Sequence, residues 1–170
     1  MIAIRQKNPR AFTLIEVMVV LAIIGIMTVL VVTSLGNGRV QRELETNARE
    51  FAAVVREAQN YALTGKQFVA GTTPCFFSVS GGGAGYTLTY GYKNVGTGAC
   101  SETSPVNYAL KNGVTFSGAV DTVPFTLPHA TLDIVAGSKS ATFIKSSTYH
   151  KVCVYADGRI TDYAGNAVCP

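Results

Sequence analysis

An uninterrupted apolar run near the N-terminus limits what this chain can fold into. Residues 12–32 read FTLIEVMVVLAIIGIMTVLVV, and Glu16 is their one charged residue. As an α-helix at 1.5 Å per residue, the run is about 31 Å long, the thickness of the hydrocarbon core of a bilayer. A carboxylate near the start of such a helix costs free energy, so it requires a functional explanation.

Three interpretations of this run are open from its pattern. A cleaved secretory signal has a basic start, but its apolar region is usually only about 7–15 residues long and is followed by a small-x-small site. An ordinary single-pass anchor accounts for the length and leaves Glu16 unexplained. The third interpretation is a short basic leader that is removed to expose the run. Residues 1–11 fit such a leader, because they hold three basic residues and no acidic one.

The junction between leader and run resembles that of the type IV pilin and type II secretion pseudopilin families. Residues 10–16 read RAFTLIE, and the apolar helix continues from there. The resemblance implies that a prepilin peptidase cuts between Ala11 and Phe12 on the cytoplasmic side, and that the new N-terminus, Phe12, is then N-methylated. These families usually have glycine before the cut, and alanine is also small.

The resemblance also implies a role for Glu16, the fifth residue after the cut. The matching glutamate of these families is thought to pair with the N-terminal amine of a neighbouring subunit, here the amine of Phe12. Such a pair relieves the cost of a carboxylate in lipid. The alternative is a glutamate that is tolerated at the level of the lipid headgroups.

Helical periodicity resumes after a short stretch of breakers. Residues 33–38 read TSLGNG, where each glycine weakens a helix by about 1 kcal/mol relative to alanine, so we expect a soft helix or a local kink. Residues 39–63 then predict an amphipathic helix, which Gly65 ends as the left-handed residue after the last turn. Its apolar stripe consists of Val40, Leu44, Phe51, Val55, Ala58 and Ala62.

Beyond Gly65 the period changes from 3.6 to 2, which predicts short strands. We expect a glycine-rich turn at residues 81–85, a hairpin turn at residues 156–159 and a loop over residues 94–105. The predicted strands are residues 67–70, 75–80, 86–92, 114–117, 125–126 with 132–134, 141–144, 151–155 and 160–163.

These elements predict an α+β fold, and the resemblance implies the pilin-like "lollipop", a long N-terminal helix packed on a C-terminal antiparallel β domain. Several short segments also resemble the H-type minor pseudopilin domain, namely residues 56–67, 112–116 and 152–160. The expected parts are a cytoplasmic leader (1–11), a transmembrane and assembly helix (12–32), an amphipathic continuation (33–65) and a β-rich extracytoplasmic domain (66–170).

Four cysteines lie beyond the apolar run, at Cys75, Cys100, Cys153 and Cys169. Their spacing lacks zinc-binding motifs, so two disulfides in an oxidising compartment are the better interpretation. Four cysteines allow three pairings. We favour Cys75–Cys100 and Cys153–Cys169 because each closes a local loop, and the second resembles the C-terminal disulfide loop of many pilins.

Composition argues against several other functions. Removing the leader leaves 11 of the 14 basic residues against 10 acidic ones, which does not suit a general nucleic-acid binder. His129 and His150 stand apart from any catalytic constellation, and no GxSxG motif occurs. We therefore expect no enzyme activity, no cofactor and no metal site.

DNA binding is the sharper alternative function. Some H-type minor pilins of competence systems resemble this chain and bind DNA through a Gly-Arg-x-Arg segment. Residues 158–161 match it but lack the second arginine. Arg159, Lys139, Lys145 and Lys151 are candidates for a basic patch, because alternate residues of neighbouring strands share a face.

The expected function is that of a structural subunit, a pilin, minor pilin or pseudopilin of a type IV pilus or type II secretion filament. The implied partners are other subunits, the prepilin peptidase, an inner-membrane assembly platform and membrane lipid. Basic residues favour the cytoplasmic side of a membrane. We therefore expect a single pass through the inner membrane with residues 1–11 in the cytoplasm, followed by a periplasmic or extracellular filament.

Overall fold

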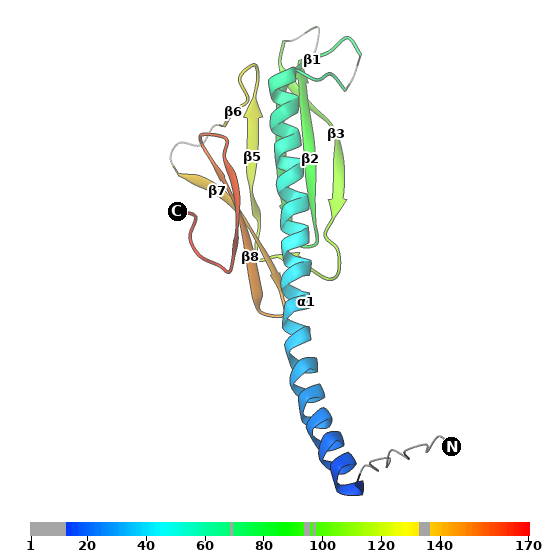
Figure 1. Ribbon diagram of the computed structural model, residues 1–170. Coiled ribbons are helices and arrows are strands. Elements are labelled where there is room, and N and C mark those ends of the chain that lie inside the picture. The colour runs from blue at the N-terminus through cyan, green and yellow to red at the C-terminus, as the bar shows by residue number, and fades with distance from the viewer. Residues whose placement is uncertain (1–12, 69, 94–95, 97, 133–136) are drawn as a thin grey trace, which may run out of the picture. The chain divides into compact units, whose positions relative to one another are not determined.

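The computed structural model describes residues 13–68, 70–93, 96, 98–132 and 137–170 (Figure 1). One helix, α1, covers Leu14–Thr64 and precedes the β-strands. The chain divides into two compact units, Met1–Gly38 and Arg39–Pro170. They are called the N-terminal unit and the C-terminal unit below, and each is described by itself.

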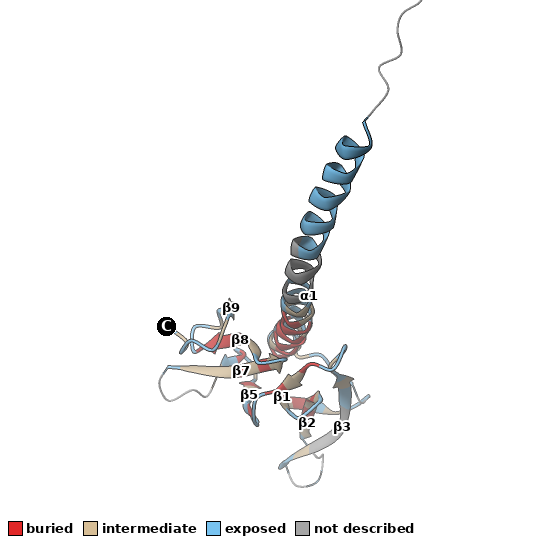
Figure 2. Ribbon diagram, turned by 90° about the horizontal axis from the view of Figure 1, so that it is seen from below, coloured by how far each residue is buried: buried red, intermediate tan, exposed pale blue. Residues whose placement is uncertain are grey.

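In the N-terminal unit, α1 begins after Thr13, whose carbonyl accepts hydrogen bonds from the N–H groups of Glu16 and Val17 at 3.1 and 3.4 Å. The large apolar side chains of this part of the helix are 48% to 78% exposed (Figure 2). They are Leu14, Ile15, Val17, Met18, Val19, Val20, Leu21, Ile23, Ile24, Ile26, Met27, Val29 and Val31.

Among the described residues, no helix is both long enough and apolar enough to cross a membrane. This finding does not support the transmembrane helix predicted over residues 12–32. The first residue of that prediction, Phe12, lies outside the described residues, and the described helix begins at Leu14.

The C-terminal unit contains two antiparallel sheets, which confirms the α+β class. The larger sheet has the strand order β3-β2-β1-β5-β6 and the smaller one the order β4-β7-β8-β9. The strands of the larger sheet are β1 (Thr73–Gly82), β2 (Gly85–Lys93), β3 (Cys100–Ala109), β5 (Val120–Thr126) and β6 (Thr131–Leu132). Those of the smaller sheet are β4 (Thr115–Phe116), β7 (Ser138–Lys145), β8 (Thr148–Tyr155) and β9 (Ile160–Ala164).

The second half of α1 buries its apolar stripe in this unit, as predicted. Leu44, Phe51 and Val55 are almost fully buried, and Val40 is half-buried against the core. The ring of Phe51 lies edge-on to Tyr86 of β2, Phe116 of β4 and Phe143 of β7, with centroid distances of 5.1, 5.8 and 5.7 Å. Phe51 therefore joins both sheets to the helix.

Glycines with positive φ lie at the end of the helix and in two hairpin turns, at the places that the sequence predicts. Gly65 has φ 61°, and the Lys66 N–H reaches back to the carbonyl of Tyr61 at 3.1 Å, which is the Schellman ending of a helix. Gly83, with φ 59°, lies in the turn between β1 and β2. Gly158, with φ 81°, lies in the turn between β8 and β9.

One loop prediction and one strand prediction are wrong, while the other predicted strands overlap the observed strands. The predicted loop over residues 94–105 contains the first half of β3, which is an edge strand paired to β2. Its polar composition and Pro105 suggested a loop, but an edge strand tolerates proline. Residues 67, 68 and 70 form no strand, and Val69 lies outside the described residues. The Phe68 ring instead packs on Tyr61, with centroids 5.2 Å apart.

Strand β3 is irregular as well as peripheral. Its register with β2 shifts between Leu88 and Tyr90, which pair with Val106 and Thr103. One residue of β2, Thr89, therefore faces two residues of β3, Ser104 and Pro105, so a bulge lies at Pro105. Bulges and prolines are typical of sheet edges, where they interrupt the row of unpaired backbone groups.

Two disulfides fasten the ends of the β structure, in the pairing that the sequence favours. Cys75 of β1 is bonded to Cys100 of β3, with their Cα atoms 6.3 Å apart. Cys153 of β8 is bonded to Cys169, with a Cα separation of 5.9 Å. The second bond holds the C-terminal segment, which follows β9, against β8.

Candidate functional site

Glu16 lies in the first turn of α1, on an otherwise apolar and exposed surface. Its immediate neighbours Ile15 and Val17 are 70% and 48% exposed. The free N–H groups at a helix start favour a carboxylate there. Within the described part of the N-terminal unit, Glu16 is thus the one anionic side chain of this apolar surface.

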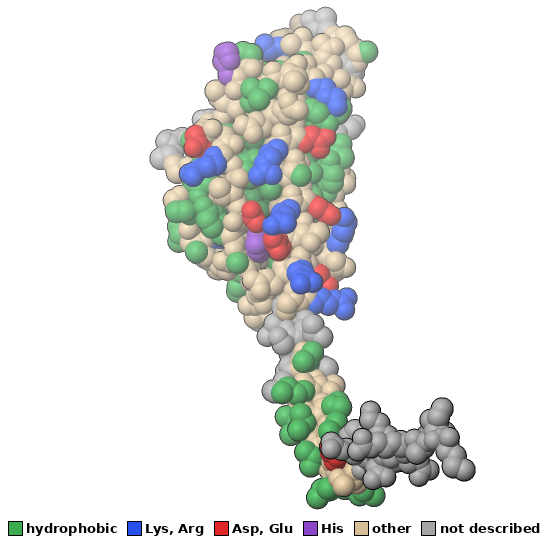
Figure 3. All heavy atoms as spheres, in the orientation of Figure 1, with side chains coloured by type: hydrophobic (Ala, Val, Ile, Leu, Met, Phe, Trp, Pro, Cys, Tyr) green, Lys and Arg blue, Asp and Glu red, His purple; other side chains and the backbone are tan. Residues whose placement is uncertain are grey.

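Five consecutive apolar side chains after Glu16, residues 17–21, are exposed, and apolar side chains line the drawn face of this part of the helix (Figure 3). Soluble monomers rarely expose continuous apolar patches larger than a few hundred Å². A helix that is apolar all round is normally buried in a protein core or in a membrane. This part of α1 is therefore an interaction surface, with Glu16 as its charged element.

The predicted processing residues, Ala11 and Phe12, lie outside the described residues. The structure therefore places neither the expected cut nor the expected pair between Glu16 and the Phe12 amine. Both stay predictions from the motif.

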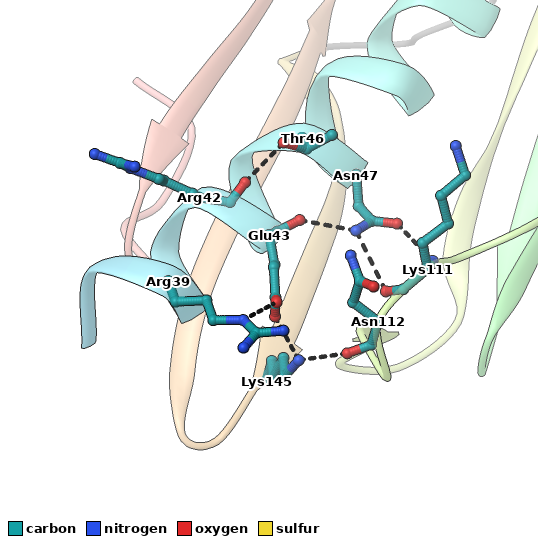
Figure 4. Close-up of polar contacts among 8 residues, drawn as sticks. All are labelled: Arg39, Arg42, Glu43, Thr46, Asn47, Lys111, Asn112 and Lys145. Atoms are coloured by element: carbon teal, nitrogen blue, oxygen red, sulfur yellow. Dashed lines mark hydrogen bonds and ion pairs between the residues drawn. The ribbon is translucent and has the colours of Figure 1, made fainter. Parts of the chain in front are cut away.

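A polar cluster fixes the start of α1 within the C-terminal unit (Figure 4). The Lys145 ammonium, at the end of β7, lies 2.5 Å from the Glu43 carboxylate, and the Arg39 guanidinium lies 2.9 Å from it. Lys145 also donates a hydrogen bond to the backbone carbonyl of Asn112. These contacts, led by the hydrogen bond from Lys145, hold the pKa of Glu43 below its usual value of 4.5.

Asn47 extends this cluster into the protein interior. Its side chain is buried. The side-chain NH₂ group donates to the backbone carbonyl of Glu43 at 2.8 Å and to that of Lys111 at 3.4 Å. The side-chain oxygen accepts a hydrogen bond from the backbone N–H of Lys111 at 2.8 Å. A buried amide is stabilising only when its hydrogen bonds are formed. The sequence analysis did not predict these hydrogen bonds of Asn47. The signal for them was an asparagine among the apolar residues Leu44, Ala48 and Phe51 of the helix stripe.

The structure does not bring the four predicted DNA-binding residues onto one face. Lys139 and Lys145 share the face of β7 that also carries the buried Ala141 and Phe143. Lys151 pairs with Thr142 in the register, and therefore lies on the opposite face of the smaller sheet.

Two of these four residues also have partners within the chain. Lys145 is bound to Glu43. The Arg159 guanidinium lies 4.3 Å from the centre of the Tyr155 ring and 3.8 Å from the Asp157 carboxylate. DNA binding by this group stays a prediction, and it has to draw on separated residues.

Neither histidine belongs to a recognisable reactive site. His129 is exposed, while His150 is buried with its Nε2 3.1 Å from the Asp162 carboxylate. Within the described part of the chain, no group of three or more histidine, cysteine, aspartate or glutamate side chains is arranged to hold a metal ion.

A comparison with known protein families gives a match that includes the first part of α1. The family model described as "Prokaryotic N-terminal methylation motif" matches residues 6–32. The type II secretion system protein H of Aeromonas hydrophila is 37% identical over 59 residues, which are 35% of this chain and 32% of that relative. No solved structure gives a significant match.

Through the motif and this relative, the chain is similar to the type IV pilin and pseudopilin family, and through the relative to its H type. More narrowly, they support a subunit of a type II secretion system or of a type IV pilus. The match spans about a third of the length of the relative, so the activity and partners of the whole protein are proposals.

Proposed function

We propose that this protein is a structural subunit of a type II secretion filament or a type IV pilus, and that it assembles through the N-terminal part of α1. The observation that carries the proposal is the apolar surface around Glu16, which is exposed on all sides of the helix. Copies of the same helix are a natural cover for such a surface, because burial of apolar area drives association.

The proposed maturation follows the motif that matches residues 6–32. The prepilin peptidase cuts between Ala11 and Phe12, and Phe12 is N-methylated. The subunit is held at the inner membrane with its N-terminus on the cytoplasmic side until an assembly platform transfers it to the filament.

Glu16 would then guide the assembly step. A carboxylate in an apolar surface is costly until a cation neutralises it. The N-terminal amine of Phe12 in a neighbouring copy supplies that cation, so that the pair favours one axial position of each new subunit. The C-terminal unit, with its two disulfides, is the extracytoplasmic domain of the proposed subunit.

The test is to recover the protein from cells that express it and to determine its N-terminus by mass spectrometry. We expect a chain that begins at methylated Phe12 and that appears in the sheared filament fraction. An Ala11→Asp variant serves as the control, because a charged residue at the cut should leave the leader in place. A wild-type protein that still begins at Met1 and never occurs in an oligomer would overturn the proposal.

A further inference from the structure

The dipeptide Arg-Glu occurs three times along α1 at a strict spacing of seven residues. It is found at residues 42–43, 49–50 and 56–57. Seven residues are nearly two turns of a helix, so equivalent positions form a row that drifts by only about 20° per repeat. The result is two parallel rows of charge, each about 21 Å long. We name them the arginine row (Arg42, Arg49 and Arg56) and the glutamate row (Glu43, Glu50 and Glu57).

The glutamate row is turned toward the sheets, and its members already have partners in the chain. Glu43 binds Lys145, Glu50 lies 2.7 Å from the Lys111 ammonium, and Glu57 accepts a hydrogen bond from Tyr61. The row is nevertheless accessible in part, because the side chain of Glu50 is 41% exposed. A carboxylate has about four acceptor positions, so an exposed glutamate that binds one cation can accept a second.

The arginine row lies on the exposed side of the helix, where all three side chains reach solvent. The Arg49 side chain is 69% exposed, and its guanidinium forms an ion pair at 2.5 Å with Glu45, one turn earlier on the same helix. Arg56 donates one hydrogen bond to the carbonyl of Ile160 at 3.3 Å. Arg42 points away from the Glu43 cluster (Figure 4). Each guanidinium has five N–H donors, so most of the donors in this row remain available to an external partner.

We propose that the arginine row of one copy binds the glutamate row of a second copy standing parallel to it. The inference rests on the proposed function, since only a filament subunit has parallel neighbours. The two rows are complementary in charge and identical in spacing, so Arg49 of one copy, 69% exposed, faces Glu50 of the other, 41% exposed, when the copies are level.

The position of the two rows on different sides of one helix also determines the kind of assembly. The contact joins unlike surfaces, so a series of copies keeps an unused arginine row at one end and an unused glutamate row at the other. A contact of this heterologous kind is not a symmetric pair, and it closes into a ring or continues into an open array according to the rotation between copies. Acidic and basic side chains lie interspersed on the face of the C-terminal unit that Figure 3 shows.

Charge exchange between the rows tests the contact. Arg49→Glu and Glu50→Arg each place like charges opposite one another in every pair of neighbours, whereas the double variant restores opposite charges throughout. We expect each single variant to reduce the protein in sheared filaments by about fivefold at low salt, and the double variant to recover to within about twofold of the wild type. Raising the salt should narrow these differences, because exposed charges are screened.

Arg159→Glu is the matched control, because Arg159 is 59% exposed and lies outside α1. It should leave filament incorporation unchanged. Thermal unfolding of each variant shows whether the C-terminal unit is still folded. If a single variant unfolds, a photo-reactive amino acid at Ala53, an exposed position between the two rows, provides the second measurement. It should cross-link to residues 39–64 of another copy.

Cross-links to lipid or to a different protein would overturn the proposed contact, as would a double variant that remains as poor as the single ones. Equal incorporation of all variants at low salt would overturn it too. In each of these cases a wild-type protein that enters filaments leaves the proposed function intact. A wild-type protein that is processed at Phe12 and yet never enters a filament removes the proposed function itself.

Discussion

The Lys145 ammonium at the end of β7 lies 2.5 Å from the carboxylate of Glu43 on α1, across a sequence separation of 102 residues. Lys145 also binds the backbone carbonyl of Asn112. This lysine therefore connects the helix, the smaller sheet and the loop before β4 at a single point. The connection is made of charged groups, so its contribution to stability depends on pH.

Stability should fall in acid through Glu43. Its pKa is lowered in the folded state by the hydrogen bonds from Lys145 and Arg39. A carboxyl of this kind stabilises the fold above its unfolded pKa, and the stabilisation is lost as the pH falls through the lower folded pKa. We expect the free energy of unfolding in urea to decline below pH 4.5, and Glu43→Gln to make that decline shallower. Glu45→Gln, a more exposed carboxyl on the same helix, should keep the decline of the wild type.

Removing the Phe51 ring should destabilise the C-terminal unit severely. The ring contacts aromatic side chains of both sheets and is 1% exposed, so Phe51→Ala leaves a cavity worth about 3–5 kcal/mol of unfolding free energy. Phe68→Ala is the control, because Phe68 is 46% exposed and should cost far less. Equal losses in urea unfolding would contradict the role of Phe51 as the joint between sheets.

Opening the bond between Cys153 and Cys169 should loosen the C-terminus before it unfolds the domain. The bond closes a loop across a separation of 16 residues, and a loop of that size is worth about 3 kcal/mol in the chain-entropy description. A Cys153→Ser/Cys169→Ser variant should show faster hydrogen exchange in residues 165–170 and in β9. If exchange there matches the wild type, the segment is held by other contacts.

Glu16→Ala should separate maturation from assembly. The helix remains apolar and the cutting site is untouched, so the protein should still be processed at Phe12. Without the carboxylate, nothing offsets the charge of a neighbouring N-terminal amine, and incorporation into filaments should fall by at least about tenfold. Glu16→Asp, which keeps the charge, should recover part of the incorporation. Normal incorporation of the alanine variant would exclude the pairing role.

Patterns with a fixed period were predictable from the sequence. The apolar stripe through Leu44, Phe51 and Val55, the helix end at Gly65 and most strands follow from periodicity and turn chemistry, which act over a few residues. Strand β3 was missed because its polar segment and Pro105 are typical of a loop, and only pairing with β2 makes it a strand. That pairing is a long-range fact with little local signal.

The polar cluster around Glu43 was not predictable for a similar reason. Glu43 has the appearance of one more surface charge on a helix, and Lys145 has the appearance of a free cation at the end of a strand. Their meeting depends on how β7 lies against α1, which no local pattern specifies. The assignment of Lys145 to a DNA-binding patch neglected this neutralising partner.

The bulge at Pro105 bears on how this domain avoids aggregation when many copies lie close together. Identical domains that lie side by side in a fibre present identical edge strands to one another. Regular edge strands can pair between chains and form cross-β aggregates. The bulge in β3 interrupts the row of unpaired backbone groups at this sheet edge, so the edge is a poor template for such pairing. In the proposed filament, strand pairing at this edge would therefore not add to the contacts between neighbouring domains.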